Sequence, residues 1–220
     1  MEGKIRILPR KTFQTNELLI NKLKTADIAT IGHYSEFGFM DKRIMCLNPN
    51  TGKVFGRAIT VHIPAQESKA LHIAVSMAME GDVIVIDRCG DAAHAAVGEM
   101  IALCSNVRKV AAIVVDGPIT DFDEIMEIGI PVFATGLSAM TTKFIADCGE
   151  INYDIVCGGI VVHPGDMIMA DKNGVLVLRD FELEGLLDVA IQDQLTENGE
   201  KQQVLAGKTL QQLYVPDYPL

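Results

Sequence analysis

The sequence predicts an α/β fold with a central parallel β-α-β-α-β core and a mixed or antiparallel C-terminal part. Three short apolar segments, Val83–Asp87, Ala111–Val115 and Pro131–Ala134, alternate with two segments of helical pattern. Strands buried on both faces read as continuous apolar runs, which favours parallel strands joined by helices. Further along, turns such as Asn173-Gly174 separate several short strands, which is typical of antiparallel pairing.

The composition is that of a globular protein with one sizeable core. The chain has 220 residues, of which 49% are hydrophobic and 22% are charged. Aromatic residues make up 5% and Trp is absent, so we expect an aliphatic core. We expect one domain over residues 1–220, with an N-terminal arm at 1–13 and a C-terminal helical extension at about 181–220.

Charge and cysteine usage restrict the partners and the compartment. The formal net charge is −10 and the isoelectric point is near 4.9, so the surface should repel nucleic acid. Five cysteines, an odd number without a CxxC pair, argue against a disulfide framework or a structural zinc site. We see no apolar segment for a signal peptide or a membrane span. The sequence therefore predicts a cytoplasmic protein with no membrane partner.

The N-terminal part begins with helices. Thr15 can cap a helix that carries Leu18, Leu19 and Leu23 on one face. A second, shorter helix is expected over Asp27–Tyr34.

Two strands and a helix follow. We expect strands at Ile44–Leu47 and Val54–Ile63, the second ended by Pro64. A helix should run over about Ser68–Met79 and stop before Gly81.

The crossover helices of the core are expected at about Glu99–Arg108 and Asp121–Ile128. A long helix from Phe181 to about Asn198 should precede a polar, helical segment with an irregular tail. The short C-terminal strands are expected at Asn152–Cys157, Ile160–Val162, Met167–Ala170 and Val175–Leu178.

Polar residues follow two neighbouring strands of the predicted core, where ligands bind in parallel α/β sheets. The first stretch, Asp87–Asp91, leads to Gly98-Glu99-Met100. The second stretch runs from Asp116 to Asp121. If the two strands are parallel neighbours in the sheet, these two loops lie side by side.

Asp121 has two interpretations. It could hold a Mg²⁺ ion, which often takes one or two carboxylates and several waters. Alternatively, Asp121 and Glu124 form a capping box at the start of their own helix. Spacing alone favours the cap.

The neighbouring residues also have alternatives. The helix amides after Gly98 attract anions, and Glu99 could hold a water or relay a proton, or simply begin a helix favourably. Asp91 could hold metal-bound water or hydrogen-bond to its own turn. Arg88 could bind a substrate carboxylate as a fork or form an ion pair.

The order and spacing of these residues resemble the RraA-like family, which includes 4-hydroxy-4-methyl-2-oxoglutarate aldolases, often misnamed demethylmenaquinone methyltransferases. The resemblance covers about residues 25–180. We find no glycine-rich adenosylmethionine loop and reject methyl transfer. The residues that carry the resemblance are Gly81-Asp82-Val83 with Asp87, Gly90-Asp91, Gly98-Glu99, Val115-Asp116-Gly117 followed by Asp121, Pro131-Val132-Phe133-Ala134, Gly158-Gly159, Pro164-Gly165-Asp166, and Ala170-Asp171 with Gly174-Val175.

The resemblance implies a β/β/α swivelling-domain fold in homotrimers or homohexamers with sites between subunits. It further implies a lyase that needs Mg²⁺ or Mn²⁺ and cleaves 2-oxo acids, such as 4-hydroxy-4-methyl-2-oxoglutarate or oxaloacetate, through a pyruvate enolate. Asp121 would bind the metal, and Glu99 and Asp91 would order waters and help proton transfer. The pyruvate carboxylate would lie against the amides that follow Gly98, those of Glu99, Met100 and Ile101.

The sequence departs from the family pattern at two cations. The arginine that precedes the metal-binding Asp is Thr120 here, and the arginine that commonly follows PVFA is Thr135. Thr120 can still donate a neutral hydrogen bond to substrate, and Arg88 could compensate. The loss of the arginine at position 120 favours an alternative function, a non-catalytic regulator that binds a protein partner such as an RNA-degrading endonuclease.

Overall fold

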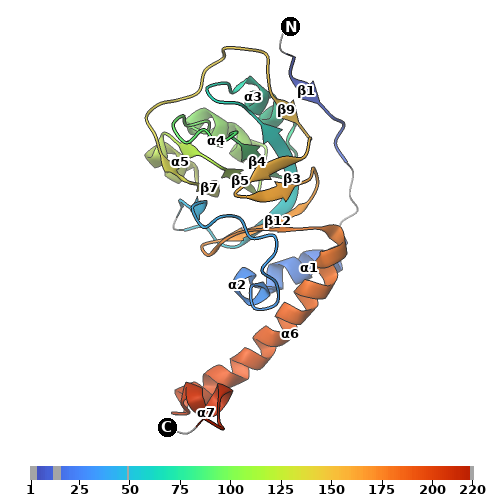
Figure 1. Cartoon of the computed structure of the whole chain (residues 1–220), viewed down its shortest axis with the longest axis vertical. Helices are drawn as coiled ribbons and strands as arrows, with labels where there is room; N and C mark the ends of the chain where they lie inside the picture. Colours follow the sequence, from blue (N-terminus) through green and yellow to red (C-terminus); the bar gives the residue numbers. More distant parts are fainter. Residues whose placement is uncertain (1–3, 12–15, 49, 219–220) are drawn as a thin grey trace.

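A sheet of mostly parallel strands forms the centre of the computed structural model, which describes residues 4–11, 16–48 and 50–218 (Figure 1). Strands β3 (Val54–His62), β4 (Val83–Asp87), β5 (Ala112–Val115) and β7 (Val132–Ala134) lie side by side in that order and run parallel. The predicted parallel core is therefore confirmed, with β3 as its first strand.

Alternate side chains of the central strands enter two different hydrophobic clusters. In β4, Ile84 and Ile86 pack on one face, whereas Val83 and Val85 pack on the other. This division follows from the two-residue period of a strand, and it explains why the core strands are apolar throughout. The first face is covered by three helices, α3 (Lys69–Met77), α4 (Glu99–Val107) and α5 (Phe122–Ile128).

The second face is covered by short antiparallel strands. The hairpin of β12 (Met167–Asp171) and β13 (Gly174–Leu178) pairs with the first half of β3 through β12. A small ribbon of β10 (Ile155–Cys157) and β11 (Ile160–Val162) packs beside it. The mixed C-terminal part predicted from the turn sequences is therefore confirmed.

A third hydrophobic cluster lies on the outer side of the hairpin. There Met169 and Leu176 meet apolar side chains from three helices. These helices are α1 (Glu17–Thr25), α2 (Ile28–Ile31) and α6 (Asp180–Leu205). The layers therefore run helix, sheet, antiparallel hairpin, helix. The remaining elements are β1 (Arg6–Ile7), β2 (Met45–Cys46), β6 (Pro118–Ile119), β8 (Gly136–Leu137), β9 (Glu150–Ile151) and α7 (Leu210–Tyr214).

Some boundaries differ from those expected. Helix α1 is capped by Asn16, whose side chain accepts a hydrogen bond of 2.7 Å from the Leu19 amide, and Thr15 lies outside the described residues. The strand expected from residue 152 begins at β10, because Asn152 has a left-handed backbone (φ 61°) that interrupts extended structure.

The C-terminal helix is longer than the pattern suggested. Helix α6 continues to Leu205 and leads away from the layered body to α7 (Figure 1). The hydroxyl of Tyr214 in α7 donates a 2.7 Å hydrogen bond to Glu200 in α6, which ties the two helices together. Among the described residues, no helix combines the length and the apolar character that a bilayer crossing requires.

Candidate functional site

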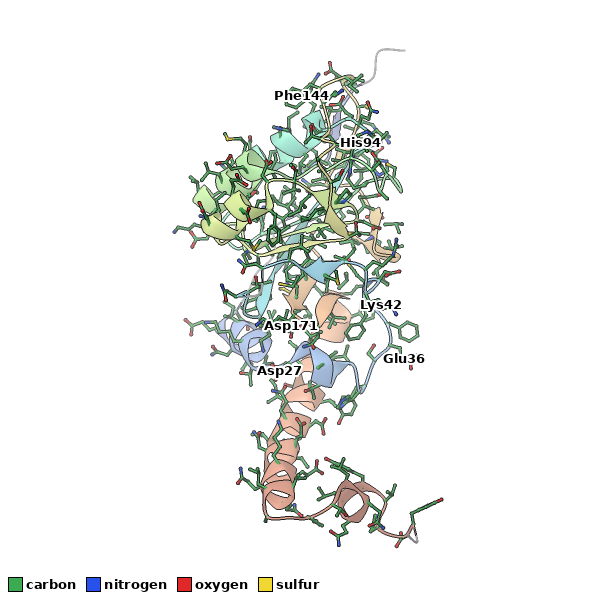
Figure 2. The ribbon with its side chains drawn as sticks, turned by 90° about the vertical axis from the view of Figure 1, so that its left-hand side faces the viewer. Asp27, Glu36, Lys42, His94, Phe144 and Asp171 are labelled. Atoms are coloured by element: carbon green, nitrogen blue, oxygen red, sulfur yellow. The ribbon has the colours of Figure 1, made fainter. Side chains whose placement is uncertain are left out.

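A cavity of about 320 Å³ opens where helix α4 begins, beside the loop that leads into α5. Its walls come from the start of α3 and from residues 95–96, 98–101, 120–121 and 141–144. Figure 2 shows Phe144, one of the lining residues, at the end of the molecule opposite α6. The cavity therefore lies outside the carboxyl ends of the core strands, the region in which ligands commonly bind in parallel α/β sheets.

Asp121 joins the two loops of the site. Its backbone is left-handed (φ 54°, ψ 48°), and its side chain makes no capping hydrogen bond to α5. One carboxylate oxygen, Oδ2, instead accepts a 2.9 Å hydrogen bond from the backbone amide of Glu99, and the Thr120 hydroxyl donates to Oδ1 at 3.2 Å. The capping-box interpretation is therefore wrong, since this backbone conformation turns the exposed carboxylate toward α4.

Gly98 permits this close approach. Its backbone is extended, so the conformation itself does not require glycine. A Cβ at this position would lie 2.6 Å from Asp121 Oδ2 and 3.0 Å from Thr120 Cγ2, closer than atoms pack. A 3.0 Å hydrogen bond from the Thr120 amide to the Val97 carbonyl holds the two segments at this distance. Glycine is thus needed for space.

The first turn of α4 forms a positively polarised wall. The amides of Glu99, Met100 and Ile101 open the helix, where backbone N–H groups lack partners within the helix. The Glu99 amide donates to Asp121, so the amides of Met100 and Ile101 are the ones left at this end of the helix. The side chain of Ile101 is buried, whereas Glu99 and Met100 are exposed at the cavity.

The structure brings together six of the eight residues that the sequence singled out. The six lie around the same cavity, which supports the expected adjacency of the two loops. They are Gly98, Glu99, Met100, Ile101, Thr120 and Asp121.

Arg88 lies elsewhere. Its side chain is fully buried, and its guanidinium donates to the carbonyls of Ile63 and Ala65 and pairs with Asp91 at 3.2 Å. Burial lowers the pKa of Arg88, although the neighbouring carboxylates oppose this effect. The side chain does not line the cavity and has its donors directed into the protein. This placement contradicts the expected contact with a substrate carboxylate, and Arg88 instead fixes its own loop.

Asp91 also serves that loop. Its Oδ1 accepts a 2.8 Å hydrogen bond from the Ala93 amide, and its Oδ2 lies 2.9 Å from His94 Nδ1. Burial by itself would raise the pKa of Asp91, but the hydrogen bonds from Ala93 and His94 and the charge of Arg88 lower it below the usual value. Since Asp91 does not line the cavity, the turn interpretation describes it better than a catalytic one.

Several lining residues were not anticipated from the sequence, and three of them bear on ligand binding. Lys143 and Phe144 come from a long irregular loop, and His72 comes from α3. The His72 ring meets Phe144 edge to face at 4.7 Å, and its Nδ1 lies 3.0 Å from the Ser68 carbonyl. Lys143 is exposed, and among the described residues its ammonium group forms no ion pair. It brings a positive charge to a site whose expected arginine is a threonine.

A buried carboxylate anchors this loop. Glu67 precedes α3 and accepts hydrogen bonds from the amides of Ser68 and Lys69 in its own turn and of Ile145 and Ala146 in the loop. Burial by itself would raise the pKa of Glu67, but the four amide donors lower it. Glu67 therefore ties the loop that carries residues 141–144 to the start of α3.

The donor set at Asp121 suits a hard cation. A carboxylate with one oxygen held by Thr120 and the other by Glu99 retains lone pairs for a metal. Mg²⁺ commonly binds through one or two carboxylates, with waters and substrate oxygens as the other ligands. Among the described residues, the three-residue group with metal-ligand geometry is His62, Asp87 and Cys89, so a cation at Asp121 would depend on such outside ligands.

Comparisons with known proteins agree with this architecture. A family profile described as RraA-like (Aldolase/RraA) matches residues 25–177. A protein of Halalkalibacterium halodurans with the provisional name 4-hydroxy-4-methyl-2-oxoglutarate aldolase is 33% identical over 158 residues, 72% of this chain and 74% of that protein.

Solved structures share the fold. Streptomyces coelicolor RraAS2, described as an unusual member of the RNase ES inhibitor RraA family, superposes with a TM-score of 0.76 at 24% identity, covering 87% of this chain and 99% of that one. An uncharacterised protein of Pseudomonas syringae superposes with a TM-score of 0.77 at 21% identity, covering 93% and 96%. The chain therefore belongs to the RraA-like family.

Proposed function

We propose that this protein is a carbon–carbon lyase that uses a divalent metal to cleave or decarboxylate small 2-oxo acids. The observation that carries the proposal is the placement of Asp121, whose carboxylate leaves its own helix uncapped and meets the start of α4 inside the cavity. The aldolase name of the 33% identical relative supports the reaction class. The substrates we propose are 4-hydroxy-4-methyl-2-oxoglutarate and oxaloacetate.

Asp121 would hold the metal, because its carboxylate is exposed in the cavity and Mg²⁺ or Mn²⁺ prefers oxygen ligands. A bound cation of this kind supplies Lewis acidity, which draws electron density from a 2-oxo group as the adjacent carbon–carbon bond breaks. The hydrogen bonds from Glu99 and Thr120 orient the carboxylate before any ligand arrives.

The chain itself would bind and orient the acid. Met100 and Ile101 line the cavity at the positive end of α4, and their amides would suit a carboxylate. Lys143 adds a full positive charge, and Thr120 adds a neutral donor. The exposed carboxylate of Glu99 would hold or deliver a proton at the carbon from which the bond has broken. Phe144 and His72 limit the size of the acid.

The test is oxaloacetate decarboxylation, followed as pyruvate release with Mg²⁺, with Mn²⁺ and with EDTA. We expect turnover with either metal and its loss with EDTA. Asp121→Asn should remove turnover, while asparagine keeps an acceptor for Glu99 and tolerates the left-handed backbone. Equal rates under all conditions, or an Asp121→Asn variant as active as the parent, would remove the proposal.

Thr120 favours a second candidate, a regulator that binds a protein partner without turnover. A threonine at the substrate-binding position weakens the recognition of a carboxylate, and RraA proteins with this fold are described as inhibitors of RNA-processing enzymes. In that case the protein shows no turnover with any 2-oxo acid, and it inhibits a purified RNA-degrading endonuclease of the same organism at equimolar ratio. Inhibition that persists in Asp121→Asn would separate the two functions.

We also propose that the chain acts as a homotrimer or homohexamer with the site near a subunit boundary. Helix α4 exposes Met100, Leu103 and Val107 beside the cavity, where an isolated chain would leave them in water. Light scattering should give a mass three or six times that of the chain. A monomer at micromolar concentration would contradict this assembly.

A further inference from the structure

A second group of metal-binding side chains lies outside the cavity. His62 ends β3, Asp87 ends β4 and Cys89 follows two residues later, and their ligand atoms all lie within 4.8 Å of one another. None of the three lines the cavity at Asp121. Composition gave no sign of this group, because no CxxC or HxxxH spacing is present and the ligands come from two strands.

Two of the ligands are fixed by the sheet. Strands β3 and β4 pair in parallel, and the register places His62 directly opposite Asp87. Directly opposite residues point to the same face of a sheet. The His62 ring reaches the Asp87 carboxylate, with Nδ1 and Oδ2 2.8 Å apart.

A tight turn returns the third ligand to this pair. Cys89 has a left-handed backbone (φ 52°) and is followed by Gly90, also at positive φ. The Cys89 amide donates a 2.7 Å hydrogen bond to Asp87 Oδ1, which closes the turn. As a result, Sγ of Cys89 lies 3.7 Å from His62 Nδ1 and 3.2 Å from Nε2. The strained backbone is the kind of conformation that persists where a site needs it.

One of these separations already matches a tetrahedral metal site, and a second is close to it. Bonds of about 2.0–2.3 Å from one cation place neighbouring ligand atoms about 3.3–3.8 Å apart. The Nδ1–Sγ distance lies in this range, and the Nδ1–Oδ2 distance reaches it with a small side-chain movement. A cation bound to Nδ1, Oδ2 and Sγ would replace the proton that His62 shares with Asp87.

The ligand types select the metal. Thiolate and imidazole are the ligands of Zn²⁺ and similar transition metals, whereas Mg²⁺ prefers an all-oxygen set. A thiolate and a carboxylate together neutralise the double charge. The nearby Arg88 has its charge balanced by Asp91. Cys89 is exposed and His62 is half-buried, so an ion can enter from solvent and a water can complete the tetrahedron.

We propose that His62, Asp87 and Cys89 form a binding site for one Zn²⁺ ion, or another thiolate-preferring divalent transition metal, separate from the Asp121 site. The ion would join the ends of β3 and β4 to the turn at Cys89. It would therefore fix the first residues of the loop that begins at Arg88. The open fourth position would make this a three-ligand site of the kind that exchanges a water for a small ligand.

Cobalt is the direct probe, because Co²⁺ replaces Zn²⁺ and a cobalt–thiolate bond absorbs in the near ultraviolet. Metal-free, reduced full-length protein would be titrated with Co²⁺. We expect one strongly bound Co²⁺ per chain with a thiolate band, and loss of this band when Zn²⁺ is added in equal amount. Cys89→Ser should remove the band, and His62→Gln should weaken binding at least tenfold.

Two control variants make the result specific. Cys104→Ser removes another exposed thiol, on α4, and should keep the band. Asp121→Asn should also keep it, which separates this site from the proposed lyase site. Circular dichroism would establish that each variant is folded. A band that survives in Cys89→Ser, or its absence in the parent protein, would overturn the proposal.

Alkylation gives a second readout that needs no cobalt. Zn²⁺ should slow the reaction of Cys89 with iodoacetamide, measured by peptide mass spectrometry, and leave Cys104 unaffected in the same sample. Mg²⁺ at the same concentration should protect neither. If Cys89 reacts equally fast with and without Zn²⁺, its contact with His62 is a hydrogen bond alone and the metal site is rejected.

Discussion

Gly98 lies so close to Asp121 that a single added carbon, Cβ, would come within 2.6 Å of the carboxylate oxygen Oδ2. We therefore expect Gly98→Ala to push the carboxylate away from the Glu99 amide. Overpacking of this kind costs about 1–3 kcal/mol of stability. Displacement of the metal-binding group should lower kcat by roughly a hundredfold. Steady-state kinetics and urea unfolding would measure the two effects.

Gly52→Ala is the matched control for this prediction. A Cβ at Gly52 meets no atom within 4 Å, so the variant should keep both stability and activity. A Gly98→Ala protein with the activity of the parent would show that the contact between the two loops does not matter for turnover.

Because of Glu67, the free energy of unfolding should depend on pH. The folded pKa of Glu67 lies below its ordinary value, so its contribution to stability is present above the ordinary pKa and is lost as pH falls through the folded pKa. Glu67→Gln should lower stability at pH 7 by roughly 2–4 kcal/mol, because one amide oxygen cannot replace a carboxylate that accepts four N–H groups. Below pH 4 the difference from the parent should shrink.

Urea unfolding at a series of pH values would measure this effect. Glu80→Gln is the control, because Glu80 is exposed and makes one surface ion pair with Lys109. A parent protein whose stability is the same at pH 7 and pH 3.5, or a Glu67→Gln variant that matches Glu80→Gln, would contradict the anchoring role of Glu67.

Arg88→Lys tests whether Arg88 holds its loop or binds substrate. Lysine keeps the charge but cannot reach the carbonyls of Ile63 and Ala65 while pairing with Asp91. We expect a stability loss of about 3 kcal/mol or more, since a buried charge network is broken. The KM for oxaloacetate should change little. A large rise in KM with unchanged stability would instead assign Arg88 to the substrate.

Thr120→Arg tests the effect of the missing cation. Thr120 lines the cavity next to Asp121, so an arginine there could reach a bound carboxylate. A charge-assisted hydrogen bond contributes about 1.5–3 kcal/mol, which corresponds to a KM at least tenfold lower. Thr196→Arg, at an exposed position on α6 outside the cavity lining, is the control. If Thr120→Arg leaves KM unchanged, Lys143 already supplies the charge that the acid needs.

Regular patterns allowed much of the fold to be predicted. Strand β4 has the bounds expected from its apolar run, and β3, β5, β7 and the hairpin lie near theirs. The boundaries that differ depend on single residues. Asn152 interrupts a strand because it adopts a left-handed backbone, which its sequence neighbours do not reveal.

The site residues at the ends of the core strands could be predicted from the sequence. The residues whose placement depends on contacts with distant parts of the chain could not. Gly98 and Asp121 follow neighbouring parallel strands, and their adjacency follows from that order. The burial of Arg88 depends on carbonyls more than twenty residues earlier, which no local pattern records. Lys143 comes from a loop without periodicity, so its place in the cavity could not be inferred.

Strand β3 belongs to two pairings at once. Its first residues pair with β12, and its last residues pair with β4 and β9. A slip of one residue along this strand would turn its apolar side chains to the wrong face in both places. The two halves of the molecule therefore cannot misalign independently, and a correct register at either end of β3 enforces it at the other.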